Sequence, residues 1–211
     1  MTTQTPAVLL DLDGTLLDSV FFHVLAWSAA FEEHGYEVPQ WKIHHGIGMG
    51  SGRLVPWLLG KHVEEFEALK QSHDRRFEDQ ADRLRPTQGA LALLDDLDTR
   101  EVPYLIATSA SADTRKTLLK ALGREDLAST ASGDVDSSKP APDLLLASCD
   151  KLGVDPGQAT LIGDSPWDME AARRIGMRGI AVRCGGFGSG RLLSAGALEV
   201  VDDPLALVGR L

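Results

Sequence analysis

Short runs of apolar residues recur along the chain at the length of buried β-strands. They lie at residues 7–10, 104–107, 159–162, 179–182 and 198–201. Helix-length segments separate the later runs, at residues 88–99, 111–122, 141–152, 166–175 and 189–195. Short apolar strands that alternate with helices are typical of a parallel sheet covered by helices on both faces. The pattern therefore predicts an α/β fold built on a parallel sheet.

The segment between the first two strand-like runs breaks this alternation. Residues 18–82 contain helical stretches near 18–35 and 62–82, with the glycine-rich segment "HHGIGMGSGR" at 44–53 between them, and no run typical of a strand. We therefore expect an all-helical domain inserted after the first strand. The predicted boundaries place the sheet domain at residues 1–17 and 84–211 and the inserted domain at residues 18–83.

Polar residues follow three of the strand-like runs at the point where each run ends. The first run leads into Asp11 and Asp13, the second into Thr108 and Ser109, and the third into Asp164. In an open α/β sheet, ligands bind at the carboxyl ends of the strands. Each polar ending taken alone is also compatible with an ordinary turn or a helix N-cap. Their occurrence together, twice with an aspartate, indicates one shared site.

Three carboxylates around one point require compensation, because like charges raise one another's pKa values and destabilise the fold. A hard divalent cation provides it, and Mg2+ prefers oxygen ligands while it keeps waters and substrate phosphate in its shell. Asp11, Asp13 and Asp164 therefore indicate a Mg2+ site of the kind used in phosphoryl transfer. One carboxylate can attack phosphorus. The second, two residues further along an extended chain, points to the same side and can handle the proton.

Three other residues are candidates for the same site. Ser109 and Lys139 offer a hydroxyl and an ammonium group for the phosphoryl oxygens, and Pro140 and Pro142 stiffen the loop that holds the lysine. Asp168 falls in the first turn of the helix after Asp164, as a possible outer partner of the metal or the lysine. The alternatives are a solvated surface lysine and an acid favoured by the helix dipole.

Composition limits the partners. The chain has 211 residues and a formal net charge of -10, which argues against a nucleic-acid backbone or an anionic membrane as partner. A small phosphorylated metabolite is compatible with this charge if a divalent cation and a few local cations reverse the sign at the site. Cys149 and Cys184 lack metal-type spacing and are interpreted as reduced thiols, with a single disulfide as the alternative. We find no signal peptide and no membrane span, so we expect a cytoplasmic protein.

Taken together, these motifs resemble those of the haloacid dehalogenase (HAD) superfamily over essentially the whole chain. Four occur in order: DLDGT at 11–15, a hydrophobic run ending in TSAS at 108–111, SKPAPD at 138–143 and GDSPWDMEAA at 163–172. The resemblance implies a Rossmann-like core with a helical cap in the position of the insert. It also implies roles for individual residues: Asp11 as nucleophile, Asp13 as general acid/base, Ser109 and Lys139 as phosphate ligands, and Asp11, Asp164 and the backbone carbonyl of Asp13 as Mg2+ ligands.

Asp13 narrows the reaction that the resemblance implies. The true haloacid dehalogenases and the phosphonoacetaldehyde hydrolases lack this acid, whereas cleavage of a phosphate ester needs it to protonate the leaving oxygen. We therefore predict a Mg2+-dependent phosphatase of the phosphoglycolate phosphatase and β-phosphoglucomutase-like subgroup. A phosphomutase is the alternative, but Met49 and His73 stand where the mutase has cap cations.

The cap is expected to set specificity. His23 and Arg53 are the candidate substrate contacts, with a hinge or core histidine and an ordinary connecting loop as the alternatives. The residues do not discriminate between phosphoglycolate and a sugar phosphate as substrate, and they carry no indication of an oligomeric state.

Overall fold

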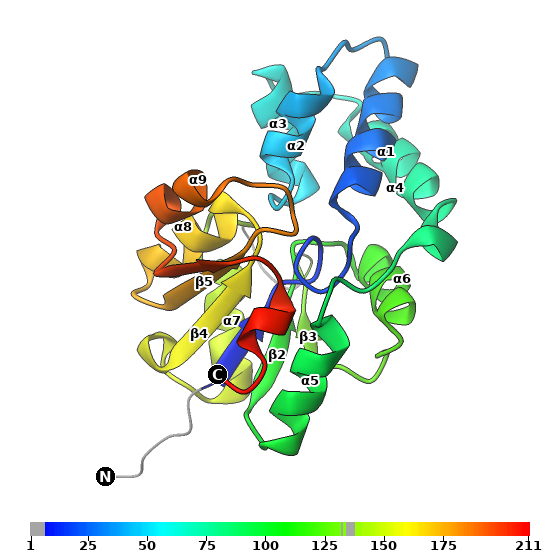
Figure 1. The fold of residues 1–211 in the computed structure, drawn as a ribbon. Coiled ribbons are helices and arrows are strands. Elements are labelled where there is room, and N and C mark those ends of the chain that lie inside the picture. Colours follow the sequence, from blue (N-terminus) through cyan, green and yellow to red (C-terminus); the bar gives the residue numbers. More distant parts are fainter. Residues whose placement is uncertain (1–6, 132, 134–137) are drawn as a thin grey trace.

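A six-stranded parallel sheet forms the centre of the larger lobe of the molecule (Figure 1). The computed structural model describes residues 7–131, 133 and 138–211, so that residues 1–6 of the predicted sheet domain lie outside the described part. Neighbouring strands pair in the order β3-β2-β1-β4-β5-β6, every pair parallel. The strands are β1 (Ala7–Leu10), β2 (Tyr104–Ala107), β3 (Ser129–Thr130), β4 (Ala159–Gly163), β5 (Arg178–Val182) and β6 (Glu199–Val201).

Helices cover both faces of this sheet (Figure 1). They are α5 (Ala90–Thr99), α6 (Ala112–Leu122), α7 (Asp143–Leu152), α8 (Pro166–Arg174) and α9 (Ser189–Ala195), with the short helices η3 (Pro156–Gln158) and η4 (Pro204–Leu207). Side chains of β1 alternate between the two layers: Val8 and Leu10 pack with α5 and α6, and Leu9 packs with α7 and α8. Strands buried on both faces explain why the sequence shows continuous apolar runs.

A second, all-helical lobe lies above the carboxyl ends of the strands (Figure 1). It contains α1 (Val20–Glu33), α2 (Gln40–Gly46), α3 (Ser51–Leu59) and α4 (Phe66–Glu78), followed by η1 (Ala81–Arg83). These helices enclose their own apolar core around Trp27, Phe31, Ile43 and Leu54. The lobe therefore has a core of its own, while Ala26 and Phe77 from α1 and α4 pack with the sheet layer of α5 and α6.

The chain passes between the lobes through two connections that run side by side. Asp18 N donates to Arg85 O at 2.9 Å, and Thr87 N donates to Leu16 O at 3.0 Å. Because entry and exit lie together, the helical lobe is attached along a single short seam. This pairing supports the predicted division into a sheet domain, residues 1–17 and 84–211, and a helical domain, residues 18–83. The division stays a prediction.

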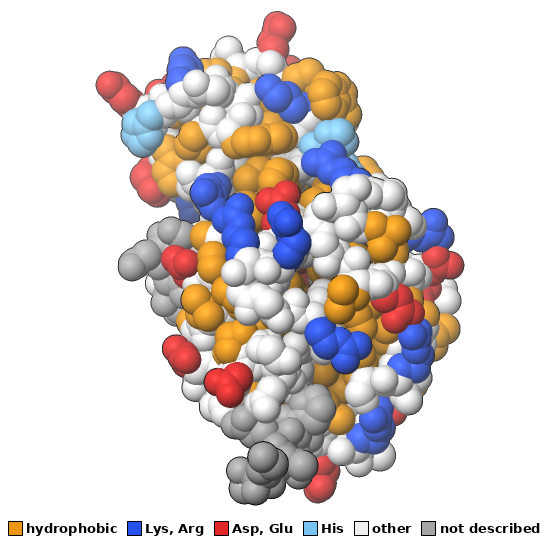
Figure 2. All heavy atoms as spheres, turned by 90° about the vertical axis from the view of Figure 1, so that its left-hand side faces the viewer, with side chains coloured by type: hydrophobic (Ala, Val, Ile, Leu, Met, Phe, Trp, Pro, Cys, Tyr) orange, Lys and Arg blue, Asp and Glu red, His pale blue; other side chains and the backbone are white. Residues whose placement is uncertain are grey.

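Figure 2 shows Lys and Arg side chains gathered where the lobes meet on one face.

The predicted α/β class is confirmed, and the five strand-like runs all form strands. Two parts of the pattern went unrecognised. β3 has only two residues, Ser129 and Thr130, and therefore carries no apolar run. The segment predicted as a loop at 44–53 is shorter, because α2 continues to Gly46 and α3 begins at Ser51.

Candidate active site

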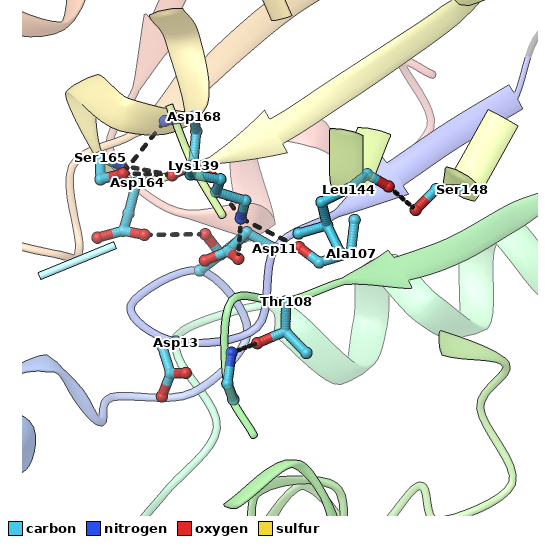
Figure 3. A network of polar contacts seen from close by, with 12 residues as sticks. Asp11, Asp13, Ala107, Thr108, Lys139, Leu144, Ser148, Asp164, Ser165 and Asp168 are labelled. Atoms are coloured by element: carbon cyan, nitrogen blue, oxygen red, sulfur yellow. Dashed lines mark hydrogen bonds and ion pairs between the residues drawn. The ribbon is translucent and has the colours of Figure 1, made fainter. Parts of the chain in front are cut away.

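The ends of β1, β2 and β4 bring the predicted polar residues to one point. β1 neighbours both β2 and β4, so the chain connections diverge to opposite sides of this strand. A ligand crevice is expected at such a switch in strand order. Figure 3 shows Asp11, Thr108 and Asp164 at this edge of the sheet, with Lys139 reaching in between them.

Lys139 is the buried cation of the site. Its Nζ lies 2.5 Å from Asp11 Oδ1 and 2.7 Å from Asp168 Oδ1, and it donates to the Ala107 carbonyl at 3.0 Å. The residue is 0% exposed. Burial favours the neutral amine, but the carboxylates of Asp11 and Asp168 outweigh it and raise the pKa of Lys139. Lys139 is therefore a fixed positive charge and not the solvated surface lysine of the alternative interpretation.

Asp168 is held in place by the start of α8. Its Oδ2 accepts from Ser165 N at 3.1 Å and from Ser165 Oγ at 2.6 Å, and Ser165 Oγ in turn accepts from Asp168 N at 3.3 Å. This reciprocal pair is a capping box, with Pro166 as the first helical residue. The cap leaves Oδ1 directed at Lys139. Asp168 thus lies where the sequence predicts an outer partner of the lysine.

Three buried carboxylates converge beside this lysine. Oxygen atoms of Asp11, Asp164 and Asp168 all lie within 4.8 Å of one another. Burial is the largest cause that raises the pKa of Asp11 and of Asp164 well above the ordinary value, and Asp168 raises both further. One lysine against three carboxylates leaves negative charge uncompensated. A hard divalent cation at Asp11 and Asp164 fits this donor set.

Asp13 turns away from the cluster toward the helical lobe (Figure 3). Its Oδ1 accepts from Ser19 Oγ at 2.5 Å and lies 2.9 Å from His23 Nε2. Burial opposes ionisation, but His23 and Ser19 outweigh it and lower the pKa of Asp13. The two aspartates of the DLDGT motif therefore stand in different environments, as two different chemical roles require.

A chain of polar contacts continues from Asp13 into the helical lobe. His23 Nδ1 lies 3.0 Å from His73 Nε2, His73 Nδ1 lies 2.8 Å from Asp74 Oδ1, and Lys70 Nζ donates to Asp74 Oδ2 at 2.7 Å. With His73 donating to the Asp74 carboxylate, its Nε2 accepts from His23 Nδ1. His23 Nε2 then shares a single proton with Asp13.

The sequence alone did not point to Lys70 or Asp74, and it pointed to His73 only as the residue that stands where the mutase has a cap cation. The available signal was their spacing of three and four residues, which places them on one face of a predicted helix. Their target, His23, lies on a different helix, so the sequence alone does not pair them. Burial lowers the pKa of His73 to about 4.

Ser109 and Arg53 differ in where the structure places them. Ser109 lines the cavity, and among the described residues its buried Oγ has no hydrogen-bond partner, as expected of a hydroxyl kept for a ligand. Arg53 is exposed on α3 and donates to the Ser138 carbonyl at 3.4 Å. It is not among the described residues that line the cavity. The structure therefore brings His23 to the site but does not bring Arg53 there.

Two glycine-rich segments meet above the carboxylates. The Gly185 carbonyl lies 2.9 Å from His44 Nε2, which ties the segment after β5 to the helical lobe. A Cβ atom on Gly185 would overlap the carboxylate of Asp164. One residue after His44, the His45 carbonyl accepts a hydrogen bond from Trp167 Nε1 at 3.2 Å, which ties the helical lobe to α8. These contacts place the segments 44–53 and 184–191 next to each other at the rim of the site.

Comparison with known proteins identifies the family. Residues 5–176 match the model of haloacid dehalogenase-like hydrolases. An N-acetylmuramic acid 6-phosphate phosphatase from Pseudomonas putida is 28% identical over 95% of this chain and 93% of its own. A phosphoglycolate phosphatase from Rhodospirillum rubrum is 31% identical over 93% of this chain and 87% of its own. The chain belongs to the haloacid dehalogenase-like hydrolases.

The structural comparison agrees. A hydrolase from Pseudomonas syringae superposes with a TM-score of 0.93 at 38% identity, covering 97% of this chain and 96% of that protein. The predicted superfamily and the predicted class, a phosphoric monoester hydrolase, are confirmed. Among the described residues, no helix is both long and apolar enough to cross a membrane.

Proposed function

We propose that this protein is a Mg2+-dependent phosphatase that hydrolyses a small phosphomonoester through an aspartyl-phosphate. The observation that carries the proposal is the contrast between the two aspartates of one motif. Asp11 lies against Lys139 in the carboxylate cluster. Asp13, two residues further along the chain, instead shares a proton with His23. Activity toward a phosphorylated amino sugar acid or phosphoglycolate in the two relatives supports the choice of a phosphomonoester.

In the first step of this mechanism, an Asp11 carboxylate oxygen attacks phosphorus and the bond between phosphorus and the ester oxygen breaks. Asp13 donates a proton to the leaving alkoxide, while Lys139 and Ser109 hold the phosphoryl oxygens. Asp11, Asp164 and the backbone carbonyl of Asp13 are the proposed Mg2+ ligands. When bound, the cation neutralises charge on the phosphoryl group.

In the second step, Asp13 takes a proton from water, and the water oxygen attacks phosphorus. The bond between phosphorus and Asp11 breaks, which releases inorganic phosphate and restores the Asp11 carboxylate. Asp168 touches neither phosphorus nor the leaving group; it orients Lys139 from the capped start of α8. A closed helical lobe excludes bulk water from the phosphorylated aspartate.

The same cavity argues against the phosphomutase alternative. Met49 and His73 both line it and neither is a cation at neutral pH, because Met49 is uncharged and burial lowers the pKa of His73 to about 4. Lys70 is the only lysine or arginine among the described lining residues, and Asp74 already matches its charge. A mutase must bind two phosphates at once.

The free thiols of Cys149 and Cys184 fit the cytoplasm, which stays the predicted location.

The test is phosphate release from a panel of phosphomonoesters by the purified protein with and without Mg2+. We expect Mg2+-dependent release that Asp11→Asn lowers at least about 1,000-fold, while circular dichroism shows an intact fold. Residual activity of Asp11→Asn near the wild-type level would remove Asp11 as nucleophile. Isomerisation of a sugar monophosphate on addition of a trace of its bisphosphate, without phosphate release, would favour the mutase.

A further inference from the structure

The cavity beside Asp13 has two kinds of lining. Side chains from the helical lobe give it an apolar wall of Trp27, Ile47, Met49 and Leu54. Next to this wall stand Lys70 and Asp74, one turn apart on α4. Ser109 and Asp11, which belong to the sheet lobe, line the same cavity, and the phosphoryl group is proposed to bind to them. A leaving group attached to that phosphoryl therefore extends toward the wall with Lys70 and Asp74.

The carboxylate of Asp74 is fixed in this wall. Its Oδ2 accepts from Lys70 Nζ at 2.7 Å and its Oδ1 lies 2.8 Å from His73 Nδ1. Burial opposes ionisation, but His73 and Lys70 outweigh it and lower the pKa of Asp74. The positive charge of Lys70 is thus already matched by a carboxylate that a second partner holds in place.

The described lining of the cavity holds a single lysine, Lys70, and no arginine. His23 is engaged on both ring nitrogens by Asp13 and His73. Asp13 is paired with His23, so this pair offers no free positive charge to an anion. An additional anion on the leaving group would therefore have to separate Lys70 from Asp74 and would then face the Asp74 carboxylate.

We propose that the Lys70 and Asp74 pair determines specificity and selects phosphomonoesters whose leaving group is uncharged and hydroxylated, such as a polyol or sugar. This rests on the proposed phosphatase function and names the class of its substrate. Hydroxyl groups donate to Asp74 through its remaining lone pairs and accept from Lys70, so they leave the ion pair intact. The apolar wall contacts the C–H faces of the same leaving group. A carboxylate or a second phosphate is excluded by charge, which is a repulsive form of specificity.

Pairs of esters that differ only in this charge test the proposal. Suitable pairs are 2-hydroxyethyl phosphate with 2-phosphoglycolate, and glycerol 3-phosphate with 3-phosphoglycerate. We expect kcat/KM of the wild-type enzyme to favour the neutral member of each pair by at least about tenfold at low salt. Preference for the anionic member would overturn the proposal while leaving the phosphatase function established.

Two variants change the wall in opposite directions. Asp74→Asn keeps an acceptor for His73 and frees the charge of Lys70, so the neutral-over-anionic ratio should fall at least about fivefold. Lys70→Gln leaves Asp74 unmatched, so the ratio should rise. Glu199→Gln is the matched control: it removes an ion pair of the same 2.7 Å length, with Arg210, on β6. A ratio that neither cavity variant moves, or that the control moves equally, would contradict the proposal.

A binding measurement separates this proposal from the proposed reaction. Thermal unfolding of the Asp11→Asn variant with Mg2+ and each ester reports binding without turnover. Greater stabilisation by the neutral esters, reversed or lost when Asp74→Asn is added to this variant, would support the selective wall even if no ester were cleaved by the wild type. Equal stabilisation by both members of each pair would refute it, whatever the activity.

Discussion

The two sides of the active-site cavity are built differently. On the sheet side, Lys139, Asp164 and Asp168 are no more than 2% exposed, and Lys139 and Asp168 are fixed by each other. On the helical side, the Lys70 and Asp74 side chains are 27% and 33% exposed. Removing one partner of a buried ion pair is strongly destabilising, whereas an exposed pair contributes little. We infer that substitutions in the proposed catalytic residues of the sheet lobe also lower the free energy of unfolding. Substitutions in the residues proposed to select the substrate should change that free energy little.

The largest expected effect is that of Lys139→Met, which breaks the sheet side of this comparison. The variant leaves Asp11 and Asp168 buried without their cation, so we expect a loss of about 3–5 kcal/mol in the free energy of unfolding. Phosphatase activity should fall about 100-fold or more, because the phosphoryl oxygens lose a charged ligand. Urea unfolding and phosphate release measure the two effects.

Lys151→Met is the control for this prediction, because Lys151 is an exposed lysine that donates to the Ser129 carbonyl. A surface change of this kind is expected to shift stability by no more than about 0.5 kcal/mol. Equal losses in the two lysine variants would show that Lys139 contributes no more than a surface lysine.

A smaller effect is expected from His73→Gln. This variant tests how much a buried residue on the helical side contributes to the free energy of unfolding. Burial lowers the pKa of His73 from 6.5 to about 4. Between these pH values the unfolded chain binds the proton more readily, so the folded state loses stability as pH falls through that window. The variant removes this loss. Its stability difference between pH 7 and pH 4.5 should therefore be smaller than that of the wild type by about 2 kcal/mol.

Urea unfolding at several pH values measures this difference, with His62→Gln, an exposed histidine, as the control. Parallel pH profiles for wild type and His73→Gln would show that His73 titrates alike in the folded and unfolded chain. In that case the assignment of donors and acceptors along the chain of Asp74, His73, His23 and Asp13 would lose its support.

The smallest expected effect is that of Gly185→Ala, at the contact between the two sides. Its Cβ would overlap Asp164, so the carboxylate must move. We expect Mg2+ affinity to fall about tenfold with little change in the unfolding temperature without Mg2+. Gly190→Ala, in the same glycine-rich segment but with open space around its Cβ, should leave Mg2+ affinity unchanged. Titration of thermal stability with Mg2+ compares the two, and identical curves would remove Gly185 as a support of Asp164.

Much of the sheet side was predictable because it follows from local pattern and topology. The apolar runs before Asp11 and Asp164 form adjacent parallel strands, and parallel strands present their carboxyl ends at one edge. Pro166 after Ser165 predicts a capped helix, and that cap is what orients Asp168. The position of Lys139 between Asp11 and Asp168 is less local, since its loop is a long way in sequence from both.

The sequence by itself determined the parallel sheet, the helical insert and the convergence of Asp11 and Asp164, since each follows from the order of strands and helices. Only the tertiary structure decided that Arg53 stays outside the cavity and that Lys70, His73 and Asp74 enter it. It also decided that His73 meets His23 and that Gly185 packs against Asp164. These contacts join elements distant in sequence, and the packing of one lobe on the other fixes which side chains face each other.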